Sequence, residues 1–311
     1  MSELDSLMEA FGKAGGDSSI LASENIAHLA ASGHRLLSVR DVAGLQVSAK
    51  GTLTGISAAI TVREGIKVEN PVHLCFGVLH KRGHQKIKMD IRLQKNAAAT
   101  FVAHCIFPKA EKVTHIMDAQ VEIGEGAEMR YSETHYHGLY GGTDVRPRSV
   151  VKVGRNGRYF SDFTLVTGIV GSLDIDYAVD AGENAVSELT ARIFGHASDE
   201  IRIKEKVSLN GENARGLIKT RIAIEDRATA EVTGITEGNA AYARGHVDCL
   251  EIVKDNAVAR AVPIVNVSNP LAKVTHEAAI GSVDKKQIET LMAHGLTPRE
   301  AVDLIVKGML Q

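Results

Sequence analysis

The sequence predicts a mainly β protein whose strands stack as a solenoid, with short helical segments at both ends of the chain. Apolar and polar residues alternate with a period of two from about residue 39 to residue 275, as in Val151–Val153 and Ile222–Ile224. Turn-forming pairs recur roughly every 30 residues, a spacing typical of repeat architectures. The chain lacks tryptophan, is 4% aromatic and contains 29 glycines, so we expect a core of small and β-branched side chains.

The recurring turns favour a solenoid over the alternative, a β-sandwich. A single unit cannot bury its apolar side alone, whereas stacked copies form a continuous core. In a sandwich the turns would recur about every 8 to 12 residues. The turn pairs are Asn96-Ala97, Gly126-Ala127, Asn156-Gly157, Asn184-Ala185 and Asn213-Ala214, followed at closer spacing by Asn239-Ala240 and Asn256-Ala257.

Residues 1–38 form the predicted N-terminal helical segment, and residues 39–281 the β core. A first helix is expected to end at the glycine pair Gly15-Gly16, and a second, short helix to run from Ser23 to Gly33. Both expectations rest on helical spacing of apolar residues. These residues are Leu4, Leu7, Met8 and Phe11 in the first helix and Ile26, Ala27 and Ala30 in the second.

Residues 282–311 form the predicted C-terminal helical segment, with two short helices. Asp284 with Gln287 and Thr297 with Glu300 have the spacing of capping boxes, and Pro298 suits the first position of a helix. Each helix has one apolar face, so we expect the two to pack as a pair. The faces are Ile288, Leu291 and Met292, and Ala301, Leu304 and Ile305.

The overall composition argues against several classes of protein. A formal net charge of −2 provides no global field for nucleic acid or an anionic membrane. No apolar run approaches the roughly 18 residues of a membrane span, and the acidic start is unlike a signal peptide. Three widely separated cysteines, Cys75, Cys105 and Cys249, without a CxxC pair, suit free thiols in a reducing compartment. We therefore expect a cytoplasmic protein without membrane or nucleic-acid partners.

Several residues are candidates for chemistry. Cys249 lies in an alternating strand and faces either the core or the outside; the plain alternative is a buried structural cysteine. His135 and His137, two residues apart, share one face of a strand, and exposed imidazoles are the equal alternative. Cys75 lies in a continuous apolar run and is expected in the core. By itself, the pair His276-Glu277 would be an ordinary surface feature.

The ordered string from His276 through Gln287 to Gly308 closely resembles the C-terminal end of the SufB/SufD family, the scaffold subunits of SUF iron–sulfur cluster assembly. Four further segments resemble family motifs, and the likeness runs from about residue 40 to the end. The N-terminal helices match poorly, and the chain is short for the family. The segments are Asn70–Leu74, Val102–Pro108, Gly124–Ser132 and Gly245–Ile252.

The resemblance implies a right-handed parallel β-helix and a non-enzymatic scaffold that builds a transient iron–sulfur cluster. By resemblance, Cys105 receives sulfur and Cys249 is its later stop. Cys249 and Glu277 carry over as assembly-site residues, with His276 beside them, although the order Asp248-Cys249 is swapped relative to the family. Whether a flavin binds is left open.

The resemblance also implies partners. An ABC-type ATPase of the SufC kind would dock on residues 284–310, and a cysteine desulfurase or another donor would supply sulfur. One chain offers Cys249, His276 and Glu277 as iron ligands, whereas about four protein ligands usually hold a cluster. A homodimer joined at the end of the β-helix would double the set, because a two-fold interface presents the same patch twice. His135 and His137 would line the sulfur route.

Two other classes remain open from the sequence. A β-helix enzyme, such as a polysaccharide lyase or a hexapeptide acyltransferase, predicts a secretion signal or tandem six-residue repeats, and neither is found. A partner-binding repeat protein without chemistry is the third class. The chain has no GxxxxGK[ST] motif, so ATP hydrolysis is expected in the partner.

Overall fold

The computed structural model describes residues 2–17, 23–53 and 55–310, and within them the chain is a β-solenoid of about eight turns flanked by helices. This confirms the predicted fold class. The helices are α1 (Glu3–Lys13), α2 (Lys285–Ala293) and α3 (Pro298–Met309). The strands are β1 (His28–Ser32), β2 (Arg35–Arg40), β3 (Leu45–Thr52), β4 (Gly55–Val62), β5 (Val72–Gly77), β6 (Arg82–Leu93), β7 (Ala98–Phe107), β8 (Lys112–Ile123), β9 (Glu128–His137), β10 (Thr143–Val153), β11 (Arg158–Thr167), β12 (Gly171–Ala181), β13 (Val186–Gly195), β14 (Glu200–Leu209), β15 (Arg215–Ile224), β16 (Thr229–Gly238), β17 (Arg244–Val253), β18 (Val258–Val267) and β19 (Lys273–Gly281).

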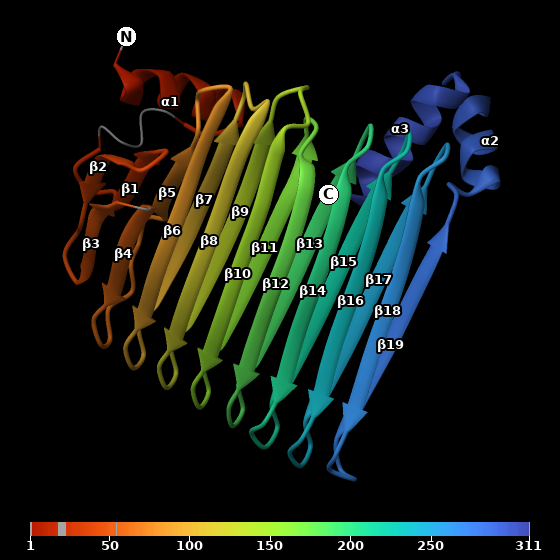
Figure 1. Cartoon of the computed structure of the whole chain (residues 1–311). Helices are drawn as coiled ribbons and strands as arrows, with labels where there is room; N and C mark the ends of the chain where they lie inside the picture. The colour runs from red at the N-terminus through yellow and green to blue at the C-terminus, as the bar shows by residue number, and fades with distance from the viewer. Residues whose placement is uncertain (1, 18–22, 54, 311) are drawn as a thin grey trace.

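From β4 onward, successive strands alternate between two sheets, and each sheet grows by one strand per turn (Figure 1). The odd-numbered strands from β5 to β19 form one sheet with β1 and β2, which we call the odd sheet. The even-numbered strands from β4 to β18 form the other with β3, the even sheet. From β4 onward the pairing within each sheet is parallel and in register; Ala98 lies beside Glu128, and Glu128 beside Arg158. Residues at equivalent positions of successive turns therefore share one face of a sheet.

The predicted turns fit this stacking because each needs a residue in the left-handed region. Asn96, Asn156, Asn184 and Asn213 have φ of 57°, 54°, 55° and 58°. Asparagine adopts this conformation more readily than most residues. In the two later, closely spaced pairs the positive φ falls instead on Tyr242 and Asp255, so Asn239 and Asn256 do not play the same role.

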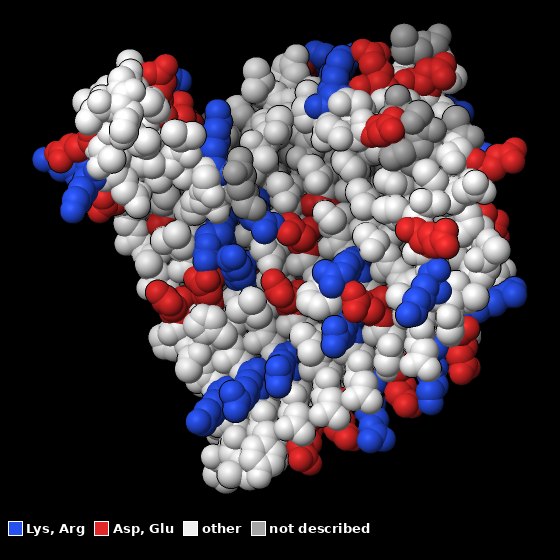
Figure 2. Space-filling model, turned by 180° about the vertical axis from the view of Figure 1, so that it is seen from behind, with Lys and Arg blue, Asp and Glu red and all other residues white. Residues whose placement is uncertain are grey.

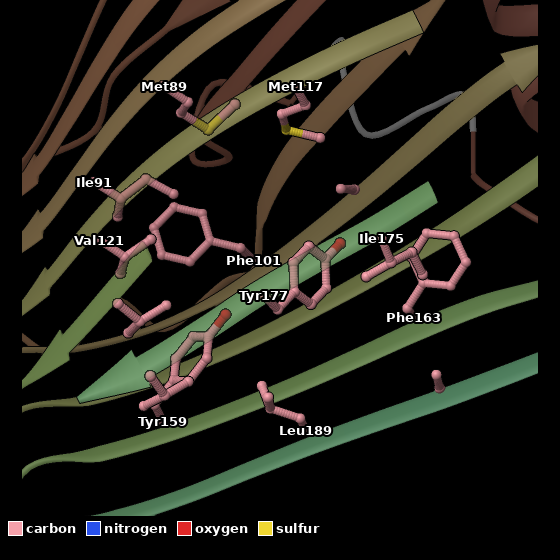
Figure 3. Packing of buried hydrophobic residues seen from close by; sticks show 14 of the residues in the cluster. Met89, Ile91, Phe101, Met117, Val121, Tyr159, Phe163, Ile175, Tyr177 and Leu189 are labelled. Carbon is pink, nitrogen blue, oxygen red and sulfur yellow. The ribbon is translucent and has the colours of Figure 1, made fainter. Parts of the chain in front are cut away.

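The core fills the space between the two sheets. In β10, burial alternates along the strand, as predicted for a strand with one face inside. Aromatic and sulfur-containing side chains gather in the first and middle turns, where Phe101, Phe163 and Tyr177 share the core with Met89 and Met117 (Figure 3). Smaller aliphatic residues fill the C-terminal half, in keeping with the low aromatic content.

The predicted helix from Ser23 to Gly33 is wrong, although its start adjoins residues 18–22, which lie outside the described chain. Residues 28–32 form strand β1, which is buried throughout and pairs with β2 and β5. A short apolar run that is buried on both faces carries no period that separates strand from helix. The first helix is confirmed as α1. It covers the outer face of the odd sheet with Leu7 and Phe11, above Cys75 and Ile106.

Both C-terminal helices are confirmed. The side chain of Asp284 accepts a hydrogen bond from the backbone of Gln287, and Thr297 and Glu300 form a complete capping box. Helix α3 packs Val306 against the outer face of the odd sheet, whereas α2 has no buried residue. None of the described helices is both long and apolar enough to cross a bilayer.

Each sheet has an edge strand at both ends of the solenoid. At the N-terminal end these strands are β2 and β3, which pair antiparallel with their neighbours; at the C-terminal end they are β18 and β19, which pair parallel. Apolar side chains are exposed there, among them Val267 and Ile280 at 49% and 46%. The face seen from behind carries interleaved charges of both signs (Figure 2), and pairs such as Lys95–Glu125 join successive turns. Such exposed pairs contribute little to stability.

Candidate functional site

A cluster of polar side chains is buried inside the N-terminal half of the solenoid. Cys105 on β7 lies beside His135 on β9 in the odd sheet, and both face the interior. Glu133 is two residues before His135, so alternation places it on the same face. His115 reaches the cluster from β8, in the opposite sheet. All four are at most 1% exposed.

The donor atoms of this cluster lie close together. The Sγ of Cys105 is 3.7 Å from Oε1 of Glu133 and 3.6 Å from Nε2 of His115. The same Oε1 accepts a 2.7 Å hydrogen bond from Nε2 of His135. One donor atom each from Cys105, Glu133 and His135 lie within 4.8 Å of one another. One thiol, one carboxylate and imidazoles thus meet in a space closed to solvent.

Hydrogen bonds on the outer side of the cluster fix the orientation of His115. The Nε2 of Gln85 donates to the carbonyl oxygens of Gly33 and Gly77, so its Oε1 faces Nδ1 of His115 at 3.0 Å. The proton of His115 therefore sits on Nδ1, and the lone pair on Nε2 points at Cys105.

The other two members are held in a similar way. Tyr131 donates to Oε2 of Glu133 at 2.9 Å. His135 Nδ1 lies 3.4 Å from His137 Nε2, and His137 Nδ1 lies 3.3 Å from the hydroxyl of Thr143. A continuous chain of hydrogen-bonding groups therefore runs from Thr143 through both histidines to Glu133.

Burial controls the protonation of these groups. It raises the pKa of the Cys105 thiol well above its usual range, and the Glu133 carboxylate raises it further. Burial also lowers the pKa of His115 to about 3 and that of His137 well below its usual range, so both imidazoles are neutral near neutral pH. For Glu133, burial acts to raise the pKa, but the hydrogen bonds from His135 and Tyr131 prevail and lower it. A charged carboxylate therefore faces a protonated thiol.

The structure thus brings together Cys105, His135 and His137, which the sequence analysis assigned to one route for sulfur. Sequence reasoning missed Glu133 and His115. The alternation that paired His135 with His137 also points to Glu133, two residues earlier. No local pattern points to His115, because it comes from the other sheet.

A second buried group lies around Cys249 on β17. Cys249 faces the interior, is 4% exposed and neighbours Thr220, which donates at 3.4 Å to Glu205 from the opposite sheet. Burial raises the pKa of Cys249 to about 11 and those of Glu205 and Glu251 to about 7. Both carboxylate oxygens of Glu251 are buried and have no hydrogen-bond partner.

His276 and Glu277 lie on the last strand, β19, and are exposed. In register, His276 lies beside Val247, which shares the inner face with Cys249, whereas Glu277 lies beside Asp248 on the outer face. Asp248 is paired there with Arg221. Within one chain the structure therefore places His276 on the side of Cys249 and Glu277 on the opposite side of the sheet.

The two cysteines share one sheet and one face. Between β7 and β17 there are five strand-to-strand steps, or about 24 Å. The interior between them holds the apolar side chains of Phe163, Leu165 and Ala191. Cys75, as expected, is in a core position; it is 2% exposed beneath α1, and burial raises its pKa to about 12.

The fold and the cluster define a class: a two-sheet β-solenoid with buried thiols facing its interior. Residues 80–309 match the family model for the SUF system of FeS cluster assembly, SufBD core domain. The chain belongs to the SufBD family of iron–sulfur cluster assembly proteins.

Named relatives agree with this assignment. The chain is 42% identical over 276 residues to an iron–sulfur cluster assembly SufBD family protein of Methanocaldococcus jannaschii, covering 89% of this chain and 87% of the relative. It is 33% identical over 308 residues to one of Pyrococcus horikoshii, covering 99% and 94%. A second P. horikoshii relative is 28% identical over 252 residues, with 80% of this chain and 56% of the relative covered.

Proposed function

We propose that this chain is a non-enzymatic scaffold on which sulfur and iron are assembled into a transient iron–sulfur cluster. The observation that carries the proposal is that, in a SufBD family chain, two buried cysteines, Cys105 and Cys249, face the same interior from the same sheet. Sulfur enters at Cys105, and the cluster forms near Cys249 at the C-terminal end of the solenoid. We call this end, where β18 and β19 are the edge strands, the open end.

The surroundings of Cys105 support its role as sulfur acceptor. A sulfur acceptor must attack as a thiolate, and burial opposes that form. The lone pair of His115 Nε2, 3.6 Å from the sulfur, is placed to take the proton, and Gln85 orients the ring. A nucleophile, a base and an orienting group in this order are typical of activated thiols. His135 and His137 line the start of the sulfur route.

At the open end, Cys249 and His276 supply ligands on the inner face, and Glu277 supplies one on the outer face. The set of iron ligands is complete only where β19 meets a second subunit, because within one chain these side chains lie on opposite faces of the sheet. The unpaired edge of β19 and the exposed apolar residues beside it support a homodimer at this end. A thiolate, an imidazole and a carboxylate bind iron weakly enough to pass a cluster on.

The remaining parts of the proposal are the partners. An ABC-type ATPase docks on α2 and α3, where Met292 and Leu304 are 41% and 50% exposed. A cysteine desulfurase or another donor supplies sulfur to Cys105.

Anaerobic reconstitution with iron and sulfide, followed by visible absorbance, tests the proposal. We expect a cluster chromophore in the natural chain, and its loss in Cys249→Ser and in Glu277→Ala without loss of fold. A hydroxyl cannot replace the thiolate, because its pKa is far higher. Cys75→Ser is the matched control and should keep the chromophore, since Cys75 lies outside the interior beneath α1.

A Cys249→Ser variant that builds a normal cluster would contradict the assigned site. A natural chain that stays colourless with the ATPase present would favour a partner-binding repeat protein without chemistry.

A further inference from the structure

The cluster around Cys105 has the composition and spacing of a metal site. We propose that Cys105, Glu133 and His135 bind a divalent transition-metal ion, Zn²⁺ or Fe²⁺, inside the solenoid. This site is separate from the cluster site at the open end and does not depend on sulfur transfer to Cys105.

The spacing of the donor atoms supports the proposal. Bonds of about 2.3 Å to sulfur and about 2.1 Å to nitrogen or oxygen place tetrahedral ligand atoms about 3.4 to 3.6 Å apart. Cys105 Sγ lies 3.7 Å from Glu133 Oε1, close to this separation. The 2.7 Å hydrogen bond from His135 to Glu133 must lengthen to about 3.4 Å to admit the ion. His115 Nε2 lies 3.6 Å from the sulfur but outside the set of donor atoms that all lie within 4.8 Å of one another, so it must move closer to fill a fourth position.

Two of the donors, Glu133 and His115, also have outer partners of the kind that metal sites use. Tyr131 holds the second oxygen of Glu133, and Gln85 fixes His115 with its Nε2 lone pair facing inward. Such partners fix the tautomer and orientation of the ligands at metal sites.

The chain of hydrogen bonds through His137 allows His135 to become a ligand. Without an ion, His135 Nε2–H donates to Glu133. If the protons of both histidines move to Nδ1, His135 donates to His137, and His137 donates to Thr143. A hydroxyl both donates and accepts, so the chain reverses without adding or losing a proton. The lone pair of His135 Nε2 then faces the ion.

The charges favour a divalent cation. A thiolate from Cys105 and the carboxylate of Glu133 bring two negative charges into a site that is closed to water. The partners that the structure gives to Glu133 are His135, Tyr131 and Cys105, which include no lysine or arginine. A bound cation balances both charges and removes the proton of the thiol outright.

Cobalt(II) is the probe, because its sulfur-to-metal charge-transfer band reports thiolate ligation directly. All variants carry Cys249→Ala, so the thiol at the open end contributes nothing. The full chain is refolded anaerobically with Co²⁺, because the site is buried, and bound metal is counted after dialysis. We expect one ion per chain with the charge-transfer band, and loss of both in Cys105→Ala.

Cys75→Ala is the matched control, since Cys75 is the other buried cysteine at this end, and it should retain the band. Tyr131→Phe removes only the hydroxyl that holds Glu133, so the band should remain while the affinity falls about 10- to 100-fold. Circular dichroism verifies that each variant is folded.

If the chain that retains Cys105 shows no charge-transfer band, the proposed metal site is wrong. A Cys105→Ala variant that keeps the band would also contradict it. Equal affinities in the Tyr131→Phe and Tyr131 chains would show that the ion lies elsewhere. Cluster reconstitution is measured in chains that retain Cys249, so its outcome tests the proposed function independently of these results.

Discussion

Cys105 shows how strongly an environment inside a solenoid controls a thiol. Burial and a neighbouring carboxylate keep it protonated, while an oriented imidazole stands within reach of its proton. Its reactivity therefore depends on losing that proton, which the proposed sulfur transfer and the proposed metal site both require.

At the residue scale, Cys105 is predicted to carry sulfane sulfur when a cysteine desulfurase and cysteine are supplied. The donor's persulfide transfers its outer sulfur to the Cys105 thiolate, and the donor's thiol leaves. Peptide mass spectrometry after alkylation locates the sulfur. Cys75→Ala should leave the labelling unchanged. Sulfane sulfur found only on Cys75 would reject the assignment.

A second residue-scale prediction concerns Glu205. Burial raises its pKa from 4.5 to about 7, so the folded state holds a proton that the unfolded state has released. Stability from this residue is therefore present below about pH 4.5 and is lost as pH rises to about 7, by up to about 3 kcal/mol. Glu205→Gln should remove this decline in urea unfolding measured across the range. The exposed Glu212→Gln is the control, and a Glu205→Gln chain with an unchanged pH profile would contradict the argument.

At the scale of single elements, the turns and the terminal helices follow local rules. Asparagines hold four of the left-handed turn positions, and the capping residues begin the helices where the sequence expected them. Because these features act locally, each can be altered without changing the rest of the stack.

The turn at Asn184 provides one test, because its φ is 55°. Alanine carries a Cβ that disfavours this conformation, so Asn184→Ala should lower the free energy of unfolding by about 1 kcal/mol. Asn184→Gly should not lower it, since glycine adopts positive φ freely. Thermal or urea unfolding measures both variants. Equal losses in the two would point to the asparagine side chain rather than to the backbone.

Helix α3 provides the test of the ATPase partner. Leu304 is 50% exposed, and Leu304→Asp places a charge on the proposed docking surface. We expect co-purification with the ATPase to be lost. Deleting the helices is a poorer experiment, because it also uncovers Ala223 and Ile252 beneath α3. Leu139→Asp, at a leucine that is 80% exposed elsewhere, should leave the complex intact. Retained binding in Leu304→Asp would move the contact away from this face.

At the scale of the whole molecule, each sheet has an edge strand at both ends, β2 and β3 near the start and β18 and β19 at the C-terminal end. Near the start, α1 covers the outer face of the odd sheet, whereas β18 and β19 leave apolar side chains exposed. An open edge of this kind tends to pair with another chain.

We therefore predict a homodimer joined at β19, measured by sedimentation equilibrium. Ile280→Glu puts a charge on the exposed end and should shift the population to monomer. Val166→Glu changes a residue of similar exposure, 38% against 46%, on a strand within the stack and should stay dimeric. A natural chain that remains strictly monomeric with the ATPase present would refute the shared site.

The sequence by itself determined the solenoid, its turns and the two C-terminal helices. Each of these features depends on a local signal, either a periodic pattern of apolar residues or a capping residue, that spans only a few neighbouring residues. The strand at residues 28–32 was mistaken for part of a helix because burial on both faces removes the period. Pairing with β2 and β5, which come later in the chain, decides its structure.

Only the tertiary structure decided which side chains meet. His115 joins Cys105 because the two sheets face each other across the interior, and no sequence spacing records that distance. Cys249 and Glu277, both expected at one site, lie on opposite faces of a sheet because in-register stacking sets Glu277 beside Asp248. Alternation tells which residues of one strand share a face. The stacking of strands decides which face is inside and what lies across from it.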